Sequence, residues 1–178
     1  MSIETPTLGT DRLLLRAFSR TDIPALIPLI GAREVAATTL RIPHPYSANH
    51  AEFLFARLEG DNEIRWAITL APDGTLIGGL GLRLERDHNR GELGYWIGVP
   101  YWGNGYATEA ARAVVQYGFA TLNLQRIYAS HFSNNPASGA LLRKIGMQHE
   151  GSFRKHILKW GQYLDLETYA LLKAERQR

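Results

Sequence analysis

The pattern of apolar and polar residues is clearest from Glu92 to Phe119, where a strand, a glycine-rich turn and a helix follow one another. The apolar residues Leu93, Tyr95, Ile97 and Val99 alternate with Glu92, Gly94, Trp96 and Gly98, and this two-residue period predicts a strand. Pro100 lacks an amide N–H and should end the pairing of that strand. After Gly105, apolar residues recur every three or four positions, which predicts a long helix with one face packed on a sheet.

The same two periods predict the other elements of the chain. Segments with strand character, bounded by turn residues, lie at residues 11–18, 63–70, 76–84, 126–132, 148–158 and 163–172. Helices are predicted after Thr21-Asp22, with Pro28 shortening the helix, after Ser47 as far as Leu58, with Gly60-Asp61 closing it, and after Asn135. Residues 32–45 are expected to be irregular. This order predicts a mixed, mostly antiparallel sheet of about seven strands with helices on both faces.

Length and composition limit the class of protein. A chain of 178 residues, 45% hydrophobic and 21% charged, fits a single α/β domain that spans residues 1–178. The net charge of +3 is spread along the chain without a run of like charges, so nucleic acid is not an expected partner. Because the first residues carry no basic flank and no run of eighteen apolar residues occurs, we expect a cytoplasmic protein without a membrane span.

The chain contains no cysteine, and its six histidines are dispersed. Disulfides, thiolate metal ligands and an acyl-cysteine intermediate are therefore excluded. The histidines show no His-Glu-x-x-His pair or other dense ligand spacing, so no metal is expected. His131 lies in a strand beside apolar residues and is more often a structural residue than a base.

The turn after the central strand is suited to an anion. Gly103, Gly105 and Ala107 keep it free of bulk, so that backbone N–H groups can approach a pyrophosphate closely beside the positive end of the helix dipole. A Walker loop needs Lys and then Ser or Thr after its last glycine, whereas Tyr106 follows here. A dinucleotide fingerprint is poorly matched, because residues 126–132 of the next strand contain no acidic residue. A tight turn that binds no ligand remains an alternative.

Residues Trp102–Ala110, WGNGYATEA, resemble the acetyl-CoA pyrophosphate loop of the GNAT superfamily of N-acetyltransferases. The usual loop has Gln or Arg, two further residues, Gly, one residue, and then Gly or Ala. Gly105 and Ala107 match this pattern, while Trp102 replaces the Gln or Arg. The aromatic residue followed by Trp-Gly-x-Gly-Tyr-Ala is similar to the RimJ/RimL-type ribosomal-protein N-terminal acetyltransferases, and the likeness extends from Thr10 to Glu175.

The resemblance implies a domain that binds acetyl-CoA and transfers the acetyl group directly to a primary amine. A protein N-terminal α-amine is the acceptor we expect. Two alternatives remain open: an acetyltransferase for a small amine such as a polyamine, amino acid or antibiotic, and a CoA-binding module without catalysis. A monomer or a homodimer would fit either case.

The family's contacts can be carried onto matching positions. Loop amides hold the pyrophosphate in this family, and the backbone of the preceding strand pairs with the pantetheine arm. The expected acetyl-CoA contacts are therefore Ile97, Gly98, Val99, Trp102, Gly103, Asn104, Gly105, Tyr106, Ala107, Thr108, Asn135 and Ser138.

Glu92 is the candidate general base, since some GNAT enzymes place a glutamate at this position of the strand. The alternative is a strand-end carboxylate in solvent. Glu92 and Ile97 are five residues apart, so an ideal strand directs them to opposite faces. A bulge, which Gly94 and Gly98 would allow, is needed to bring both toward one site.

Asn135 and Ser138 resemble the Asn-x-x-Ser motif of the RimJ/RimL branch. An amide side chain suits the amide-rich pantetheine arm, and a hydroxyl can give a proton to the departing thiolate. Helix capping is the alternative for both residues. Many GNAT enzymes carry a tyrosine four residues after this serine as the acid, but that position is Leu142 here, so Ser138 becomes the substitute.

Overall fold

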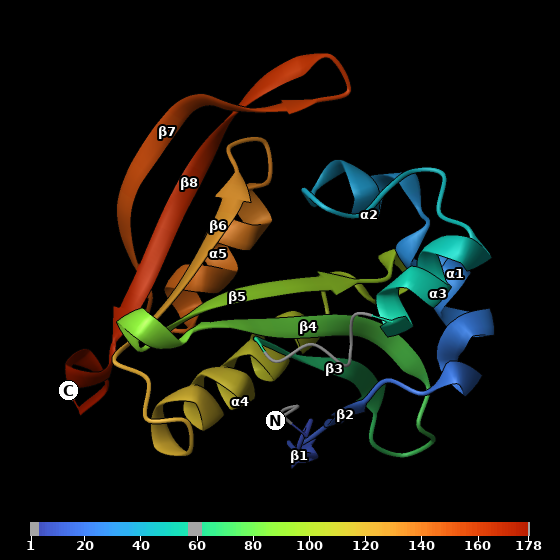
Figure 1. Cartoon of the computed structure of the whole chain (residues 1–178), viewed down its shortest axis with the longest axis horizontal. Coiled ribbons are helices and arrows are strands. Elements are labelled where there is room, and N and C mark those ends of the chain that lie inside the picture. The colour runs from blue at the N-terminus through green and yellow to red at the C-terminus, as the bar shows by residue number, and fades with distance from the viewer. Residues whose placement is uncertain (1–3, 57–61, 178) are drawn as a thin grey trace.

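The computed structural model describes residues 4–56 and 62–177, and an eight-stranded sheet runs through these residues (Figure 1). The strand order is β1-β2-β3-β4-β5-β6-β8-β7, and only β5 and β6 are parallel neighbours. The strands are β1 (Leu8–Gly9), β2 (Leu13–Ala17), β3 (Glu63–Leu70), β4 (Leu76–Glu85), β5 (Arg90–Ile97), β6 (Arg126–Phe132), β7 (Gln148–Lys159) and β8 (Gln162–Leu172). The predicted mixed, mostly antiparallel sheet is confirmed. The additional strand is β1, which is too short to show a period in the sequence.

Helices cover both faces of the sheet, as predicted. Within the described residues they are α1 (Ile23–Ile30), α2 (Arg33–Ala37), α3 (Ala48–Ala56), α4 (Tyr106–Ala120) and α5 (Pro136–Lys144). Helices α4 and α5 contribute to the main core on one face of the sheet. Helices α1 and α3 build a second core against the other face, over the ends of β3, β4 and β5 (Figure 1). The result is a three-layer α/β arrangement around one sheet.

Two features before β3 differ from the prediction. Residues 32–45 are not wholly irregular, because the five-residue helix α2 lies there with Val35 and Ala36 buried. Such a short helix gives too few turns to establish a helical period. Pro28 lies inside α1 without ending it, since its ring faces solvent and its missing N–H removes only one helical bond. The predicted helix end at Leu58 and its closure at Gly60-Asp61 lie outside the described residues.

Strand β5 directs its side chains to both layers. Leu93 and Ile97 are buried in the main core with α4, and Tyr95 packs against that core. Trp96 packs instead with the cluster of α1 and α3. Glu92 is an even number of residues from Trp96 and therefore shares its face of the sheet. The central strand thus separates Tyr95 on one face from Glu92 on the other.

Strands β5 and β6 pair along only part of their length. Parallel pairing joins Arg90–Glu92 to Arg126–Tyr128. Beyond that point β5 continues beside β4 and β6 continues beside β8, and Figure 1 shows the two strands diverging. The facing backbone edges after Glu92 therefore have N–H and C=O groups that the sheet leaves available for a ligand.

Candidate active site

Two glycines shape the loop between β5 and α4. Gly103 and Gly105 have φ angles of 77° and 79°, in the left-handed region that other residues rarely adopt. Helix α4 begins at Tyr106, and no side chain caps its first turn. The first N–H groups of a helix have no intrahelical partner and carry the positive end of its dipole. The loop is therefore a cradle of free donors with room for an anion.

Side chains within the loop hold its shape. The Trp102 indole Nε1 donates to the Ile97 carbonyl at 2.7 Å, and the Asn104 amide donates to the Tyr101 and Trp102 carbonyls at 3.2 and 3.0 Å. Because these side chains are occupied by the loop itself, they contribute by fixing its backbone. This gives Trp102 a structural reason to stand where Gln or Arg is usual.

Arg12 and Glu109 form a second support that the sequence did not indicate. Glu109 accepts hydrogen bonds from the Thr10 hydroxyl at 2.6 Å, the Arg12 backbone N–H at 2.9 Å and Arg12 Nε at 2.7 Å. Burial alone would raise the pKa of Glu109, but these bonds from Thr10 and Arg12 outweigh it and hold the pKa below its usual value. The ionised carboxylate fixes Arg12, whose Nη1 donates to the Asn104 carbonyl at 3.0 Å. A cation therefore stands beside the cradle.

Ser138 has a partner that the sequence reasoning missed. Its Oγ lies 2.6 Å from the Tyr95 hydroxyl, so the hydrogen bond links α5 to β5 near the gap between β5 and β6. Burial raises the pKa of Tyr95 to about 12, and the bond with Ser138 offsets this only in part. Tyr95 is therefore protonated at neutral pH. The sequence did contain one signal for this contact: Tyr95 brings a hydroxyl group to the apolar face of the strand, between Leu93 and Ile97.

Asn135 caps helix α5. Its side-chain oxygen accepts from the Ser138 N–H at 3.4 Å, and its own N–H donates to the Phe132 carbonyl at 2.8 Å. The capping alternative is thus observed for Asn135. Through this bond Asn135 also fixes the first turn of α5, which carries Ser138.

Glu92 is a partly buried residue in an ion pair. Its carboxylate is bonded to the Arg83 guanidinium on β4, and its side chain is 29% exposed. The bulge that we expected in β5 is absent, because pairing with β4 is unbroken from Gly78↔Ile97 to Glu85↔Arg90. Strand β5 therefore separates from β6 without a bulge, because the two strands diverge after Glu92. Glu92 and the Tyr95–Ser138 pair therefore lie on opposite faces, beside the same gap.

The model of the Acetyltransferase (GNAT) domain family matches residues 12–148. The chain belongs to the GNAT acetyltransferases. A GNAT relative, the uncharacterized N-acetyltransferase YoaA of Bacillus subtilis, is 36% identical over 173 residues, covering 94% of this chain and 97% of its own. The [ribosomal protein uS5]-alanine N-acetyltransferase of Escherichia coli is 37% identical over 79 residues, 44% of this chain and 41% of its own.

Solved GNAT structures have the same fold. A GNAT-family acetyltransferase from Bacillus anthracis superimposes with a TM-score of 0.86 at 26% identity, over 95% of this chain and 99% of its own. The spermidine N-acetyltransferase of Vibrio cholerae, solved with CoA and spermine, gives 0.84 at 24% identity, over 95% and 100%. The protein is thus an acetyl-CoA-dependent N-acetyltransferase of class EC 2.3.1, with homologues among the ribosomal-protein enzymes.

Other predicted GNAT positions have mixed surroundings. Leu142, where many GNAT enzymes carry a tyrosine, is fully buried in the main core and is not available to a ligand. The Gly98 N–H donates to the Ile77 carbonyl at 2.8 Å, so it is already used by β4. Val99 opens a 3-10 turn, Val99–Tyr101, whose first N–H has no partner within the turn. Of these three positions, Val99 alone offers a free backbone donor.

A separate pocket lies beside α5, lined by His131, Arg143, Glu167 and Tyr169 among others. His131 is 7% exposed and its Nδ1 donates to the Phe132 carbonyl at 2.8 Å, which fits the structural role expected for it. No group of three His, Asp or Glu side chains among residues 4–56 and 62–177 is placed to hold a metal ion. In the same residues, every helix is too short or too polar to cross a bilayer.

Proposed function

We propose that this enzyme acetylates the α-amine of a protein or peptide N-terminus, directly and within a ternary complex. The observation that carries the proposal is the gap between β5 and β6, with a carboxylate at one face and a hydroxyl pair at the other. An amine that enters from the face of Glu92 meets a thioester placed in the gap. The departing sulfur then lies toward Tyr95 and Ser138.

The residues of the cradle fit a pyrophosphate. Nothing lies within 4 Å of a Cβ built on Gly103, and only Arg12 Nη2, at 3.6 Å, lies near one built on Gly105. Gly103, Gly105 and the first turn of α4, Tyr106–Thr108, would supply N–H donors, with Trp102 and Asn104 fixing the loop. The free edge of β5 would pair with the amides of the pantetheine arm, as an added strand does.

Proton transfers are assigned to residues on both sides of the gap. Acetyl-CoA supplies the activated acetyl group and a sulfur that must be protonated after transfer. Glu92 takes the proton of the amine, directly or through water. We assign Tyr95 as the donor in its 2.6 Å hydrogen bond with Ser138 Oγ, an assignment that leaves the Ser138 O–H free to point at the sulfur. No cysteine is present to carry the acetyl group, so transfer is direct.

The site has few groups that can transfer protons, and this favours an α-amine as the acceptor. An α-amine with a pKa of about 7.7–8.0 is neutral in roughly a tenth of molecules at pH 7, whereas a lysine at about 10.4 is neutral in about one in 2,500. That difference is about 3.5 kcal/mol of deprotonation work. The base assigned to the amine is Glu92, which is ion-paired with Arg83, and the α-amine is the acceptor that needs the least deprotonation.

A competition between two peptides tests the acceptor. One peptide has a free N-terminus and no lysine, and the other has a blocked N-terminus and one lysine. We expect acetylation of the first only, located by mass spectrometry. Preference for the lysine peptide would overturn the assignment, and turnover of a polyamine or aminoglycoside with neither peptide modified would establish the small-amine alternative.

Tyr95→Phe should lower kcat by about tenfold at saturating acetyl-CoA, at the weaker end of general-acid contributions, with little change in KM. The change removes the donor to Ser138 but keeps the ring that packs against the core. Tyr117→Phe, on α4, is the matched control and should leave kcat unchanged. A Tyr95→Phe enzyme with normal kcat, or with a raised KM for acetyl-CoA alone, would contradict the proton relay.

A further inference from the structure

One face of the sheet carries four carboxylates and four arginines that pair one to one. The pairs are Glu63–Arg65, Glu92–Arg83, Glu85–Arg90 and Glu150–Arg126. Strand register places the members on β3–β6 on the face of Glu92, and Glu150 of β7 reaches Arg126 on that face. We call these eight residues the charged face. It is the face from which the acceptor is proposed to approach.

Two glycines, Gly81 and Gly94, lie between Arg65 and Glu92 on the charged face. Arg65 is opposite Gly81, and Gly81 is opposite Gly94, which follows Glu92 on the same face of β5. A Cβ built on Gly81 would lie 2.7 Å from Glu63 Oε1, whereas one built on Gly94 meets nothing within 4 Å. The side chains of Glu63 and Arg65 therefore lean over Gly81, and open space begins above Gly94.

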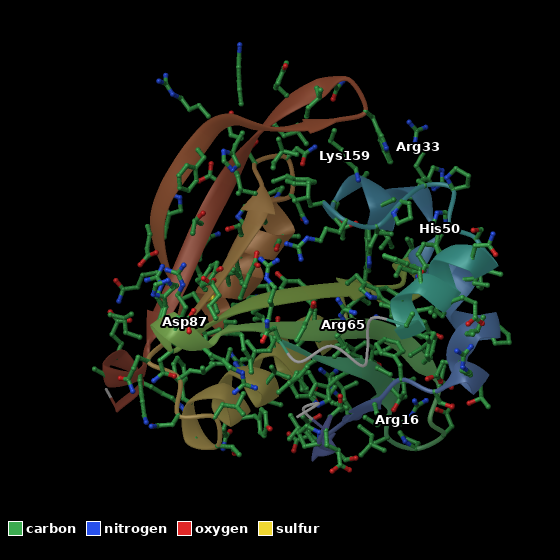
Figure 2. All side chains as sticks on the ribbon, viewed as in Figure 1. Arg16, Arg33, His50, Arg65, Asp87 and Lys159 are labelled. Atoms are coloured by element: carbon green, nitrogen blue, oxygen red, sulfur yellow. The ribbon has the colours of Figure 1, made fainter. Side chains whose placement is uncertain are left out.

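The distances fit a short peptide. Neighbouring strands are about 4.8 Å apart, so the Arg65 backbone is about 10 Å from Gly94. One extended residue spans about 3.5 Å. An acceptor with its α-amine between Gly94 and Glu92 therefore brings its second or third residue to Arg65, the labelled side chain at β3 and β4 in Figure 2.

The charge pattern of this face does not suit a polycation. Each of its four carboxylates is already paired with an arginine, so this face offers no cluster of unpaired carboxylates to several ammonium groups at once. Two buried donors of this face, Arg65 Nη1 and Arg90 Nε, have no hydrogen-bond partner among the described residues. Donors without partners are satisfied by oxygen atoms.

Two more cations lie on the same side of the sheet, where the β7–β8 hairpin meets α2. Lys159 Nζ donates to the Thr39 carbonyl at 2.8 Å, and the Arg33 guanidinium lies 5.2 Å from the Trp160 ring centre (Figure 2). Within residues 4–56 and 62–177 neither cation forms an ion pair. They add positive charge that a polyamine would have to approach.

We infer that the acceptor carries carboxylate groups close to its amine, as in an N-terminus followed by Asp or Glu, and that Arg65 selects it. This inference rests on the proposed α-amine function and narrows it to acidic N-termini. The charged face then binds the acidic side chains through Arg65 while Glu92 meets the amine. Basic peptides and polyamines meet like charge on the same face, which opposes their binding.

The test compares kcat/KM for peptides with free N-termini of sequence Ser-Asp-Asp-Ala, Ser-Ala-Ala-Ala and Ser-Arg-Arg-Ala, together with spermidine and free glutamate. We expect the acidic peptide to exceed the basic one by about tenfold, the size of one partly screened charge contact. Spermidine should be slower still. Arg65→Ala and Arg65→Gln both leave Glu63 without its cation and should reverse the order of the acidic and basic peptides.

Arg20→Ala is the matched control, because it makes the same change of net charge and also frees a glutamate, Glu52, but lies outside the charged face. It should leave the peptide order unchanged. Equal rates on all three peptides would overturn the inference and leave the N-terminal acceptor standing. Turnover of glutamate but of no peptide would keep the carboxylate requirement and overturn the proposed function. If spermidine is the fastest acceptor, both the carboxylate requirement and the proposed N-terminal acceptor are overturned.

Discussion

Replacement of Gly105 by valine is expected to abolish the stabilisation that acetyl-CoA gives to the folded protein. Gly105 has a φ of 79°, where a branched side chain is strained, and its Cβ would stand where the pyrophosphate approaches the first N–H groups of α4. A ligand that binds only the native state at about 100 times its Kd stabilises it by about 2.7 kcal/mol. Thermal unfolding with and without acetyl-CoA measures this gain.

Gly74→Val provides a control for backbone strain. Gly74 has a φ of 73° and nothing within 4 Å of its Cβ, but it lies in the turn between β3 and β4, away from the cradle. The two variants should lose similar stability without ligand, while only Gly74→Val keeps the gain from acetyl-CoA. If Gly105→Val is stabilised as much as the wild type, the pyrophosphate is bound elsewhere.

Glu92→Gln is expected to lower turnover of an α-amine substrate by about 10²-fold at neutral pH, the lower end of the range for a general base. The substitution keeps the shape of the side chain and removes its ability to take a proton. The loss should shrink as pH rises through the pKa of the amine, about 7.7–8.0, because the neutral acceptor no longer needs a base. A pH profile of kcat/KM for both enzymes measures this difference.

Glu52→Gln is the control for this experiment, since it also neutralises an ion-paired glutamate, bound to Arg20, but lies outside both the gap and the charged face. It should remain close to wild-type activity at every pH. A Glu92→Gln enzyme that loses the same factor across the whole pH range would mean that Glu92 only holds Arg83 or binds the acceptor. Unchanged kinetics of Glu92→Gln would mean that Glu92 takes no part in catalysis or in acceptor binding.

Local features of the site were predictable from the sequence. Strand β5, the cradle and α4 are contiguous, so glycine positions and the two hydrophobic periods were enough to place them. Asn135 before Pro136 also indicated a helix start, and the structure shows that cap. Such features depend on residues a few positions apart, where the sequence itself carries the geometry.

Contacts between distant segments were not predictable in the same way. Tyr95 meets Ser138 across 43 residues, and Arg12 meets Glu109 across 97, so only the strand order brings them together. The predicted bulge was wrong for a related reason. Glycines permit a bulge, but the separation of β5 from β6 depends on where β6 turns toward β8, which residues 92–99 do not encode.

The ion pairs of the charged face were even less predictable from the sequence than these contacts. Alternation in β3, β4 and β5 indicated which residues share a face, yet the one-to-one pairing of arginines and glutamates required the strand register. A one-residue slip would place these charges in the core, so burial of the apolar rows fixes the register. The sequence therefore contained the charges, and the sheet arranged them into pairs.

The most direct measurement of acetyl transfer follows thiol release and peptide acetylation in one reaction, with acetyl-CoA and a free N-terminal peptide both varied. We expect thiol and N-terminally acetylated peptide in equal amounts, and initial rates that give intersecting double-reciprocal lines, as a ternary complex requires. Thiol release without acetylated peptide, or parallel lines from an acetylated enzyme, would contradict direct transfer to an α-amine in the gap between β5 and β6.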